Sequence, residues 1–515
     1  MYDTHDLKQR LEQIDAVIAA GPYTDTWESL SHWRVPDWYG NAKFGIFIHW
    51  GVYSAAAYLN EWYPRNMYIQ GTEEFKHHEE LFGSHTQAGY KDYIPKLTAE
   101  HFDAAEWVRT FTEAGADYMI PVAEHHDGFQ MYRSEVSHWN AYEMGPHRDV
   151  LGELKEAAGQ AGLTMGASSH RIEHWWFLGG SREYDSDISA LAPEPGEDGS
   201  IQPAGQRGDL YWPTMPSPSD MFDTRSTPWP SQEFLDDWLV RTCEIVDRFR
   251  PAVLYFDWWI QHESARAHLR RLAAYYYNVM EREGRTGVLC YKHDEFAFGC
   301  AVPDMERGHF AQAQPFVWQT DTAICHNSWC YTLQNRYKKA PDILRTLVDA
   351  VSKNGRLLLN VGPKPDGTLT AEESEVLRLI GAWMQVNGEA LKGCTPYRIC
   401  QEGPTQMEEG MFMEDRPLVY TPEDFRFFMN HGCLYAAALA PSADGTYRIR
   451  TLGRRREDGQ PRYLGAIRRV WSPELKKELS FEMTDEALVV SGGPAEAAPD
   501  PETPGAPVLL QLELL

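Results

Sequence analysis

A single aspartate at the end of an apolar segment is the residue with the clearest chemical potential. Asp257 follows the run VLYF and precedes two tryptophans within the segment 252–259. Burying a carboxylate in such surroundings is costly unless the group is hydrogen-bonded or used in a reaction. An ionised carboxylate among aromatic rings is suited to attack an electron-poor sugar carbon, and this reaction needs no metal. The structural alternative is an aspartate that caps the following helix.

Histidines and aromatic residues occur together in three short motifs that suit hydrogen bonding to a sugar and stacking against it. The motifs are FIHWG at 47–51, NEWY at 60–63 and EHHDGF at 124–129. Successive strand residues point to opposite faces, so the adjacent histidines of EHHDGF can both face a site only if the strand has ended there. The aromatic rings could equally pack the mouth of a barrel. The three motifs supply His49, Glu61, Trp62, His125 and His126.

Metal catalysis is a competing interpretation of the same histidines, because His49, His125 and Asp257 could act as metal ligands. However, the sequence contains no HExxH motif and no second carboxylate–histidine pair at helical spacing. We therefore expect a site without a metal or any other cofactor. The histidines would then donate hydrogen bonds to sugar hydroxyls.

Glycoside hydrolysis typically requires a second carboxyl group, and the sequence offers more than one candidate for it. Asp304 and Glu306 lie in VPDMERGHF at 302–310, a segment with no strong helical or strand pattern. Asp294 and Glu295 lie in DEF, just after another apolar run. Sequence spacing alone does not choose among these four residues.

Apolar runs alternate with helical patterns as far as about residue 390, which predicts a parallel sheet covered by helices. Repetition of this pattern favours a closed (β/α)8-like TIM barrel, in which the chemistry collects at the carboxyl ends of the strands. We expect strands at 43–51, 117–128, 164–170, 252–259, 287–294, 315–322 and 356–362, and helices at 101–116, 149–162, 231–250, 264–283 and 341–355, with Ser231 as an N-cap. The expected strand ends carry His49, His125 to Asp127, Ser169 and His170, Asp257, Lys292 to Asp294, and Gln319 to Asp321.

Two domains are expected, with a boundary at about residue 395. Residues 1–395 contain the barrel, an N-terminal helix with apolar positions at helical spacing, and a loop at 185–230 that is rich in proline, glycine and aspartate. Short alternating runs separated by turns predict an antiparallel β-sandwich over 396–515. The long loop is either a lid over the site or a surface excursion without function.

Composition excludes some classes of function. The chain has 48 Lys and Arg against 75 Asp and Glu, a net charge of −27. Such a surface repels phosphate backbones and anionic lipid, so we expect neither a nucleic-acid partner nor a membrane partner. None of the eight cysteines forms a CxxC pair, and the N-terminus lacks the pattern of a signal peptide. We expect reduced thiols and a cytoplasmic location.

Six motifs, taken together and in order, resemble the α-L-fucosidases of glycoside hydrolase family 29. The similarity runs from about residue 35 to about residue 400. It implies a (β/α)8-like barrel, a C-terminal β-sandwich, retention of configuration and no cofactor. The motifs are AKFGIFIHWGVYS (42–54), NEWY (60–63), EHHDGF (124–129), VLYFD (253–257), SWCY (328–331) and SKNGRLLLNVGPKPDG (352–367).

Carried over motif by motif, this resemblance implies roles for individual residues. Asp257 would be the nucleophile. The acid/base position varies most within the family, and we expect it at Glu306 of DMERG, with Glu295 as the alternative. The residues that would bind the fucose ring are His49, Glu61, Trp62, His125 and His126.

The chain also departs from the pattern of the family at substrate-contacting positions. Trp258 stands where the family often has glycine, and with Trp62 it would flank the face of the sugar that carries the methyl group. Ser169 or His170 would take the place of a frequent tyrosine, and Lys292 would replace a frequent arginine. We interpret these changes as typical of a separate branch of the family rather than of a loss of activity, because Asp257 is retained.

The sequence thus predicts an exo-acting, retaining α-L-fucosidase that hydrolyses terminal α-L-fucosyl residues of oligosaccharides or glycoconjugates. Three alternatives stay open: a non-catalytic carbohydrate-binding protein, a hydrolase of a related L-sugar glycoside, and a metal-dependent sugar isomerase or aldolase. The partner would be a fucosylated oligosaccharide, and a homo-oligomer is left open.

Overall fold

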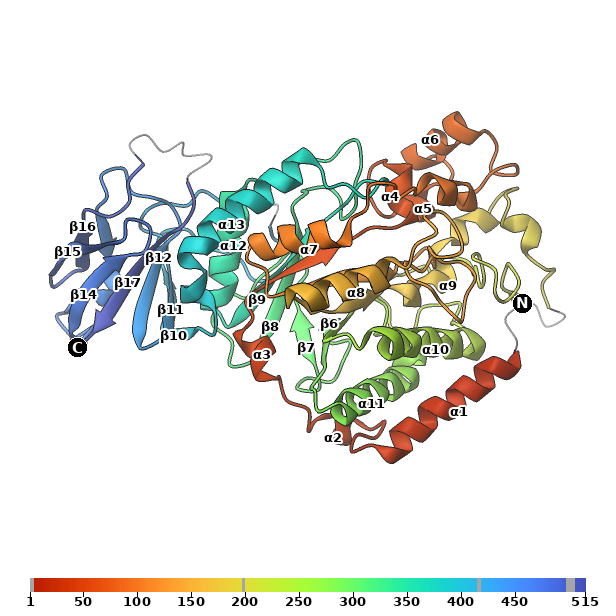
Figure 1. Ribbon diagram of the computed structural model, residues 1–515, viewed down its shortest axis with the longest axis horizontal. Coiled ribbons are helices and arrows are strands. Elements are labelled where there is room, and N and C mark those ends of the chain that lie inside the picture. The colour runs from red at the N-terminus through yellow and green to blue at the C-terminus, as the bar shows by residue number, and fades with distance from the viewer. Residues whose placement is uncertain (1–3, 197–199, 415–417, 497–504) are drawn as a thin grey trace.

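The barrel predicted from the sequence is present as a closed parallel sheet (Figure 1). The computed structural model describes residues 4–196, 200–414, 418–496 and 505–515. The barrel strands are β1 (Phe44–Ile48), β2 (Tyr118–Glu124), β3 (Thr164–Met165), β4 (Ala167–Ser169), β5 (Val253–Phe256), β6 (Val288–Lys292), β7 (Val302–Asp304), β8 (Trp318–Ala323) and β9 (Gly355–Val361). Strand β1 pairs with both β9 and β2, which closes the sheet. Because β3 and β4 both pair with β2 on the same side, the nine segments fill eight barrel positions.

Helices cover the outside of the barrel (Figure 1). The predicted cap of the 231–250 helix is confirmed, since the side chain of Ser231 accepts a hydrogen bond from the backbone N–H of Phe234. The N-terminal helix is also present and packs on two barrel helices, α10 and α11, whose bounds are given next. The helices are α1 (Thr4–Ala20), α2 (Trp27–Leu30), α3 (Asp37–Asn41), α4 (Val52–Ala56), α5 (Tyr63–Asn66), α6 (Glu73–Phe82), α7 (Ala104–Glu113), α8 (Val150–Ala161), α9 (His174–Phe177), α10 (Gln232–Phe249), α11 (Arg266–Arg282), α12 (Ala340–Ser352) and α13 (Ala371–Leu391).

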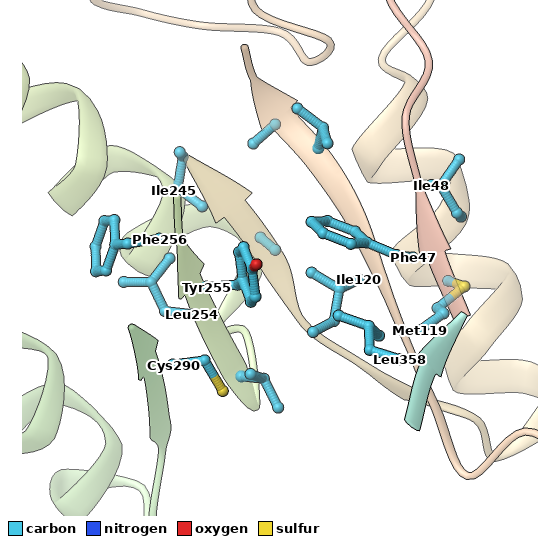
Figure 2. Close-up of a cluster of buried hydrophobic side chains, with 14 of the residues drawn as sticks. Phe47, Ile48, Met119, Ile120, Ile245, Leu254, Tyr255, Phe256, Cys290 and Leu358 are labelled. Atoms are coloured by element: carbon cyan, nitrogen blue, oxygen red, sulfur yellow. The ribbon is translucent and has the colours of Figure 1, made fainter. Parts of the chain in front are cut away.

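The barrel interior is filled by large side chains of facing strands. Figure 2 shows Phe47, Ile120 and Tyr255 pointing toward one another inside the barrel. The ring centroids of Phe47 and Tyr255 are 4.9 Å apart. Phe256 points to the opposite side of β5 from Tyr255 (Figure 2). Every residue of β1, β2 and β5 is buried, which is why parallel strands appear in a sequence as continuous apolar runs.

Strand β7 is the one barrel strand that the sequence pattern does not predict. It has three residues, pairs with β6 through Cys290–Val302 and Lys292–Asp304, and joins β8 through Asp304. A strand this short shows no periodicity, and Pro303 lacks a backbone N–H for the ladder. The strand nevertheless matters, because it ends two residues before Glu306.

The predicted antiparallel C-terminal domain is present as one curled sheet that encloses its own core. The strand order is β10-β11-β12-β17-β14-β15-β16-β13, and Figure 1 shows the sheet beside α12 and α13. Helix α12 packs against β10 and β11, so the sheet adjoins the barrel directly. The strands are β10 (Thr395–Glu402), β11 (Phe425–Asn430), β12 (Cys433–Ala438), β13 (Tyr447–Ile449), β14 (Ile467–Ser472), β15 (Lys477–Met483), β16 (Leu488–Ser491) and β17 (Val508–Leu514).

The predicted loop at 185–230 contains little regular structure, apart from a 3₁₀ turn at Ser189–Leu191 and a bridge between Ala204 and Thr214. Its residues 197–199 lie outside the described part of the chain. All eight cysteines are unpaired and buried. Among the described residues, no helix has the length and apolar character needed to cross a bilayer.

Candidate active site

A cavity of about 390 Å³ opens at the carboxyl ends of the barrel strands and contains the candidate active site. All ten residues predicted for the site line it: His49, Glu61, Trp62, His125, His126, His170, Asp257, Trp258, Lys292 and Glu306. The adjacent histidines of EHHDGF both reach the cavity because β2 ends at Glu124, before the alternation of a strand can separate them. Residues from distant motifs meet here because parallel strands bring their carboxyl ends to one edge of the barrel.

Asp257 follows directly after β5 and receives contacts from two histidines. Nδ1 of His170 lies 3.1 Å from its Oδ2 atom, and Nε2 of His126 lies 3.5 Å from the same oxygen. Burial alone would raise the pKa of Asp257, but the N–H groups of His126 and His170, together with the charge of Lys292, lower it well below its usual range. The side chain is 18% exposed, so an ionised carboxylate faces the cavity.

His126 is a cation in this arrangement. Its Nδ1 atom lies 3.0 Å from the carbonyl oxygen of His170, and its Nε2 atom faces the Asp257 carboxylate. Both partners can only accept hydrogen bonds, so both ring nitrogens must carry protons. Burial works against this charge, but Glu173, 3.4 Å from Nδ1, and Asp257 together raise the pKa of His126 to about 9.

Two other histidines are neutral. His170 uses Nδ1 for Asp257 and Nε2 for the hydroxyl of Ser168, and burial lowers its pKa. His49 donates from Nδ1 to the amide oxygen of Asn360 at 2.7 Å, which leaves Nε2 as an acceptor. Burial holds the pKa of His49 well below its usual range.

His125 completes the histidine group, and the predicted Glu61 also contacts a neighbouring loop. Burial keeps the pKa of His125 well below its usual range, and its buried Nδ1 atom has no partner among the described residues. The carboxylate of Glu61 accepts hydrogen bonds from the backbone N–H of Trp329 at 2.8 Å and from the hydroxyl of Ser328 at 3.3 Å.

Glu306 faces the same cavity in a different environment. The indole N–H of Trp258 donates to its Oε2 atom at 2.7 Å, and the Lys292 ammonium lies 3.0 Å from that oxygen. Burial raises the pKa of Glu306 to about 7; Lys292 opposes this shift, whereas Asp321 and Asp257 add to it. Within the described part of the chain Oε1 makes no hydrogen bond, so it can carry a transferable proton.

Lys292 was predicted to contact the substrate, and its ammonium is shared among three carboxyl groups. Besides Glu306, it lies 2.9 Å from Oδ2 of Asp321 and 3.3 Å from Oδ1 of Asp304. Tyr255 donates from its hydroxyl to Asp321 at 2.7 Å. One cation cannot neutralise three carboxylates, and burial together with Asp321 raises the pKa of Asp304 well above its usual range.

The alternative acid, Glu295, lies away from the cavity lining. It is buried and accepts hydrogen bonds from the backbone N–H groups of Trp259 at 3.1 Å and Lys292 at 3.2 Å. Both bonds fix the backbone next to residues of the site. The geometry therefore favours Glu306 over Glu295 as the second carboxyl group.

Several cavity residues were not predicted from the sequence, and their signals differ. Arg307 directly follows Glu306, and its guanidinium lies 4.6 Å from the ring centre of Trp329, which belongs to the SWCY motif. Glu173 lies in the segment ASSHRIEHWW, where no periodicity marks it. Phe222 and Phe412 come from segments without any motif.

The histidine group also has the spacing of a metal site. Ligand atoms of His49, His125 and His170 lie within 4.8 Å of one another, as do those of His126, His170 and Asp257. However, both nitrogens of His170 are already hydrogen-bonded to protein groups. The rings of His125 and His170 also stack, with 27° between their planes, whereas two ligands of one ion must aim ring edges at it. This arrangement favours hydrogen bonding to a ligand over metal coordination.

Comparison with known proteins agrees with the geometry of the site. The family model described as Alpha-L-fucosidase matches residues 11–389. Tissue alpha-L-fucosidase of Rattus norvegicus is 29% identical over 397 residues, 75% of this chain and 76% of that protein. Plasma alpha-L-fucosidase of Homo sapiens is 30% identical over 387 residues, 72% of each. A crystal structure of Thermotoga maritima alpha-fucosidase in complex with fucose has a TM-score of 0.70 and 26% identity, covering 95% of this chain and 100% of that one. The chain therefore belongs to the α-L-fucosidase family and is a glycoside hydrolase.

Proposed function

We propose that this protein is an exo-acting, retaining α-L-fucosidase that removes terminal α-L-fucosyl residues from oligosaccharides or glycoconjugates by double displacement. The observation that carries the proposal is a pair of carboxyl groups that face one cavity and whose pKa values are shifted in opposite directions. Asp257 is held ionised, whereas the pKa of Glu306 is raised to about 7. Such a pair can attack a sugar carbon and protonate its leaving group in one step.

In the first step, an oxygen of Asp257 forms a bond to the anomeric carbon of fucose as the bond to the glycosidic oxygen breaks. Glu306 transfers its proton to that oxygen, so the leaving group departs as a neutral alcohol. The products are a fucosyl ester of Asp257 and an ionised Glu306.

In the second step, Glu306 acts as the base. Esterification removes the negative charge of Asp257, which is one cause of the raised pKa of Glu306. The carboxylate of Glu306 then accepts a proton from a water molecule, and the resulting hydroxide oxygen attacks the anomeric carbon. The ester bond breaks, fucose is released with its original configuration, and both carboxyl groups return to their first states.

Other lining residues would bind the fucosyl ring. His49 offers an acceptor nitrogen, and the buried Nδ1 atom of His125 has no partner among the described residues, so both rings can bond to sugar hydroxyls. Trp62 lies beside His126, with ring centroids 5.7 Å apart, and gives an apolar surface to the same part of the cavity. We propose that this surface meets the face of the sugar with the methyl group.

The stereochemistry of hydrolysis tests this function. Proton NMR of an aryl α-L-fucoside during hydrolysis should show α-L-fucose first, with the β-anomer growing later by mutarotation. First appearance of the β-anomer would contradict double displacement. A protein that only binds the sugar would release no aryl alcohol at all.

A further inference from the structure

Three aromatic side chains from separate segments line the mouth of the cavity. Phe222 belongs to the loop at 185–230, Trp258 follows the nucleophile, and Phe412 comes from the chain between β10 and β11. Phe222 is 74% exposed and Phe412 is 55% exposed, which is unusual for residues of this size. We call these three residues the aromatic rim.

The rings of the rim have a defined mutual geometry. The planes of Trp258 and Phe412 are within 12° of parallel, with centroids 6.3 Å apart. Phe222 meets Trp258 edge-on at 81°, with centroids 6.2 Å apart. The rim thus exposes flat apolar surface from two directions around Trp258.

Two residues of the rim are hydrogen-bonded to the proposed proton donor, Glu306. Trp258 donates its indole N–H to the Glu306 carboxyl group, and the backbone N–H of Phe412 donates to the carbonyl oxygen of Glu306 at 2.9 Å. An acid must lie beside the glycosidic oxygen that it protonates. The group bonded to that oxygen therefore leaves past the rim.

Phe412 is held in place by a built connection to the barrel. Its φ of +56° lies in the left-handed region, which is strained for a bulky residue and persists only where the surroundings enforce it. The backbone N–H of Met413 donates to the carbonyl of Arg307 at 3.0 Å. The carboxylate of Glu414 binds Arg307 and, at 2.7 Å, Lys338. These contacts fix the position of Phe412, although its backbone is strained and its side chain is exposed.

From this geometry we infer that the aromatic rim is the binding site for the leaving group, and that this group is a pyranose ring with an apolar C–H face. The inference rests on the proposed function and names Phe222 and Phe412 as residues that select for the leaving group of that reaction. Flat aromatic surface beside the acid stabilises a ring that lies against it, whereas it offers nothing to a small or fully hydrated leaving group.

The test compares two substrates that share fucose and differ in the leaving group. One is an α-L-fucosyl-(1→2)-galactoside, and the other is α-L-fucosyl fluoride, whose leaving fluoride is too small to reach the rim. In Phe412→Ala and Phe222→Ala, the ratio of kcat/KM for the disaccharide to that for the fluoride should fall roughly 3- to 10-fold, as expected for loss of one aromatic contact. Phe412→Tyr should restore the ratio.

Phe298→Ala is the matched control, since Phe298 is 66% exposed and lies outside the cavity lining. This variant should leave the ratio unchanged, and thermal melting should show that all variants fold. An unchanged ratio in both rim variants, or equal losses on both substrates, would overturn the inference while leaving the proposed function intact. If the wild-type protein hydrolysed neither of the two compounds, the proposed function would be overturned and the inference with it.

Discussion

The two carboxyl groups that face the cavity differ in their partners more than in their depth. The side chain of Asp257 is 18% exposed and that of Glu306 is 10% exposed. Asp257 lies among histidines that direct N–H groups at it, one of them charged. Glu306 shares one ammonium with Asp304 and Asp321 and has a single indole donor of its own. Both carboxyl groups are largely buried, so their hydrogen-bond donors and the nearby charges decide which of the two is ionised.

Removing the nucleophile should have the largest effect on this comparison. Asp257→Asn keeps the shape of the side chain but cannot form the ester, so kcat for an aryl α-L-fucoside should fall roughly 10³-fold or more. Steady-state assays would measure the loss, with Asp294→Asn as a control because Asp294 is exposed and outside the cavity lining. Near-wild-type turnover by Asp257→Asn would refute the assignment.

Removing the acid should produce a loss that depends on the leaving group. In Glu306→Ala, hydrolysis of a fucosyl disaccharide should fall roughly 10²- to 10⁴-fold, because an alcohol leaves poorly without a proton. Activated aryl fucosides should lose less, and azide should restore part of their turnover. Glu295→Gln is the comparison variant, since within the described ranges the Glu295 side chain accepts hydrogen bonds from backbone N–H groups alone. If Glu306→Ala lost equal activity on both substrates, another group would be the acid.

Removing the charged histidine should shift the pH dependence of the nucleophile. Because the N–H group of His126 lowers the pKa of Asp257, its loss in His126→Phe should raise that pKa. Asp257 must be ionised to react, so the acid limb of the pH profile of kcat/KM should move to higher pH. The basic limb, set by Glu306 near pH 7, should move less. An acid limb that stays in place would show that His126 does not tune the nucleophile.

The last effect concerns stability rather than turnover. Folding raises the pKa of Glu306 from 4.5 to about 7, so the folded state holds this proton more tightly than the unfolded state does. The resulting stabilisation is fully present below pH 4.5 and is lost as the pH rises through 7. Relative to Glu306→Gln, the free energy of unfolding of the wild type should therefore fall by about 3 kcal/mol across this range. Urea titrations at several pH values would measure it, and a constant difference would contradict the raised pKa.

The barrel could be predicted, as could the place of ten residues in the cavity lining, because both leave a local signal. Buried parallel strands appear as apolar runs such as VLYF, and the polar residue after each run falls at one edge of the barrel. His126 and Asp257 thus meet, although their segments lie far apart in the chain.

Features that depend on contacts between segments could not be predicted in this way. Strand β7 has too few residues for a pattern, and the pairing of Lys292 with Asp321 follows from barrel closure rather than from spacing. Phe412 reaches the cavity with the support of Glu414, which binds Arg307 and Lys338 across 107 and 76 positions of the chain. The boundary at 395 and the cytoplasmic location stay predictions.

Covalent trapping tests the assignment of the two carboxyl groups most directly. The protein would be incubated with a 2-deoxy-2-fluorofucosyl fluoride, digested at low pH and mapped by mass spectrometry. The fluorofucosyl group should be found as an ester on Asp257, in the peptide that contains VLYFDWW. A label on Glu306 or Asp321, or continued turnover with no labelled peptide, would contradict the account.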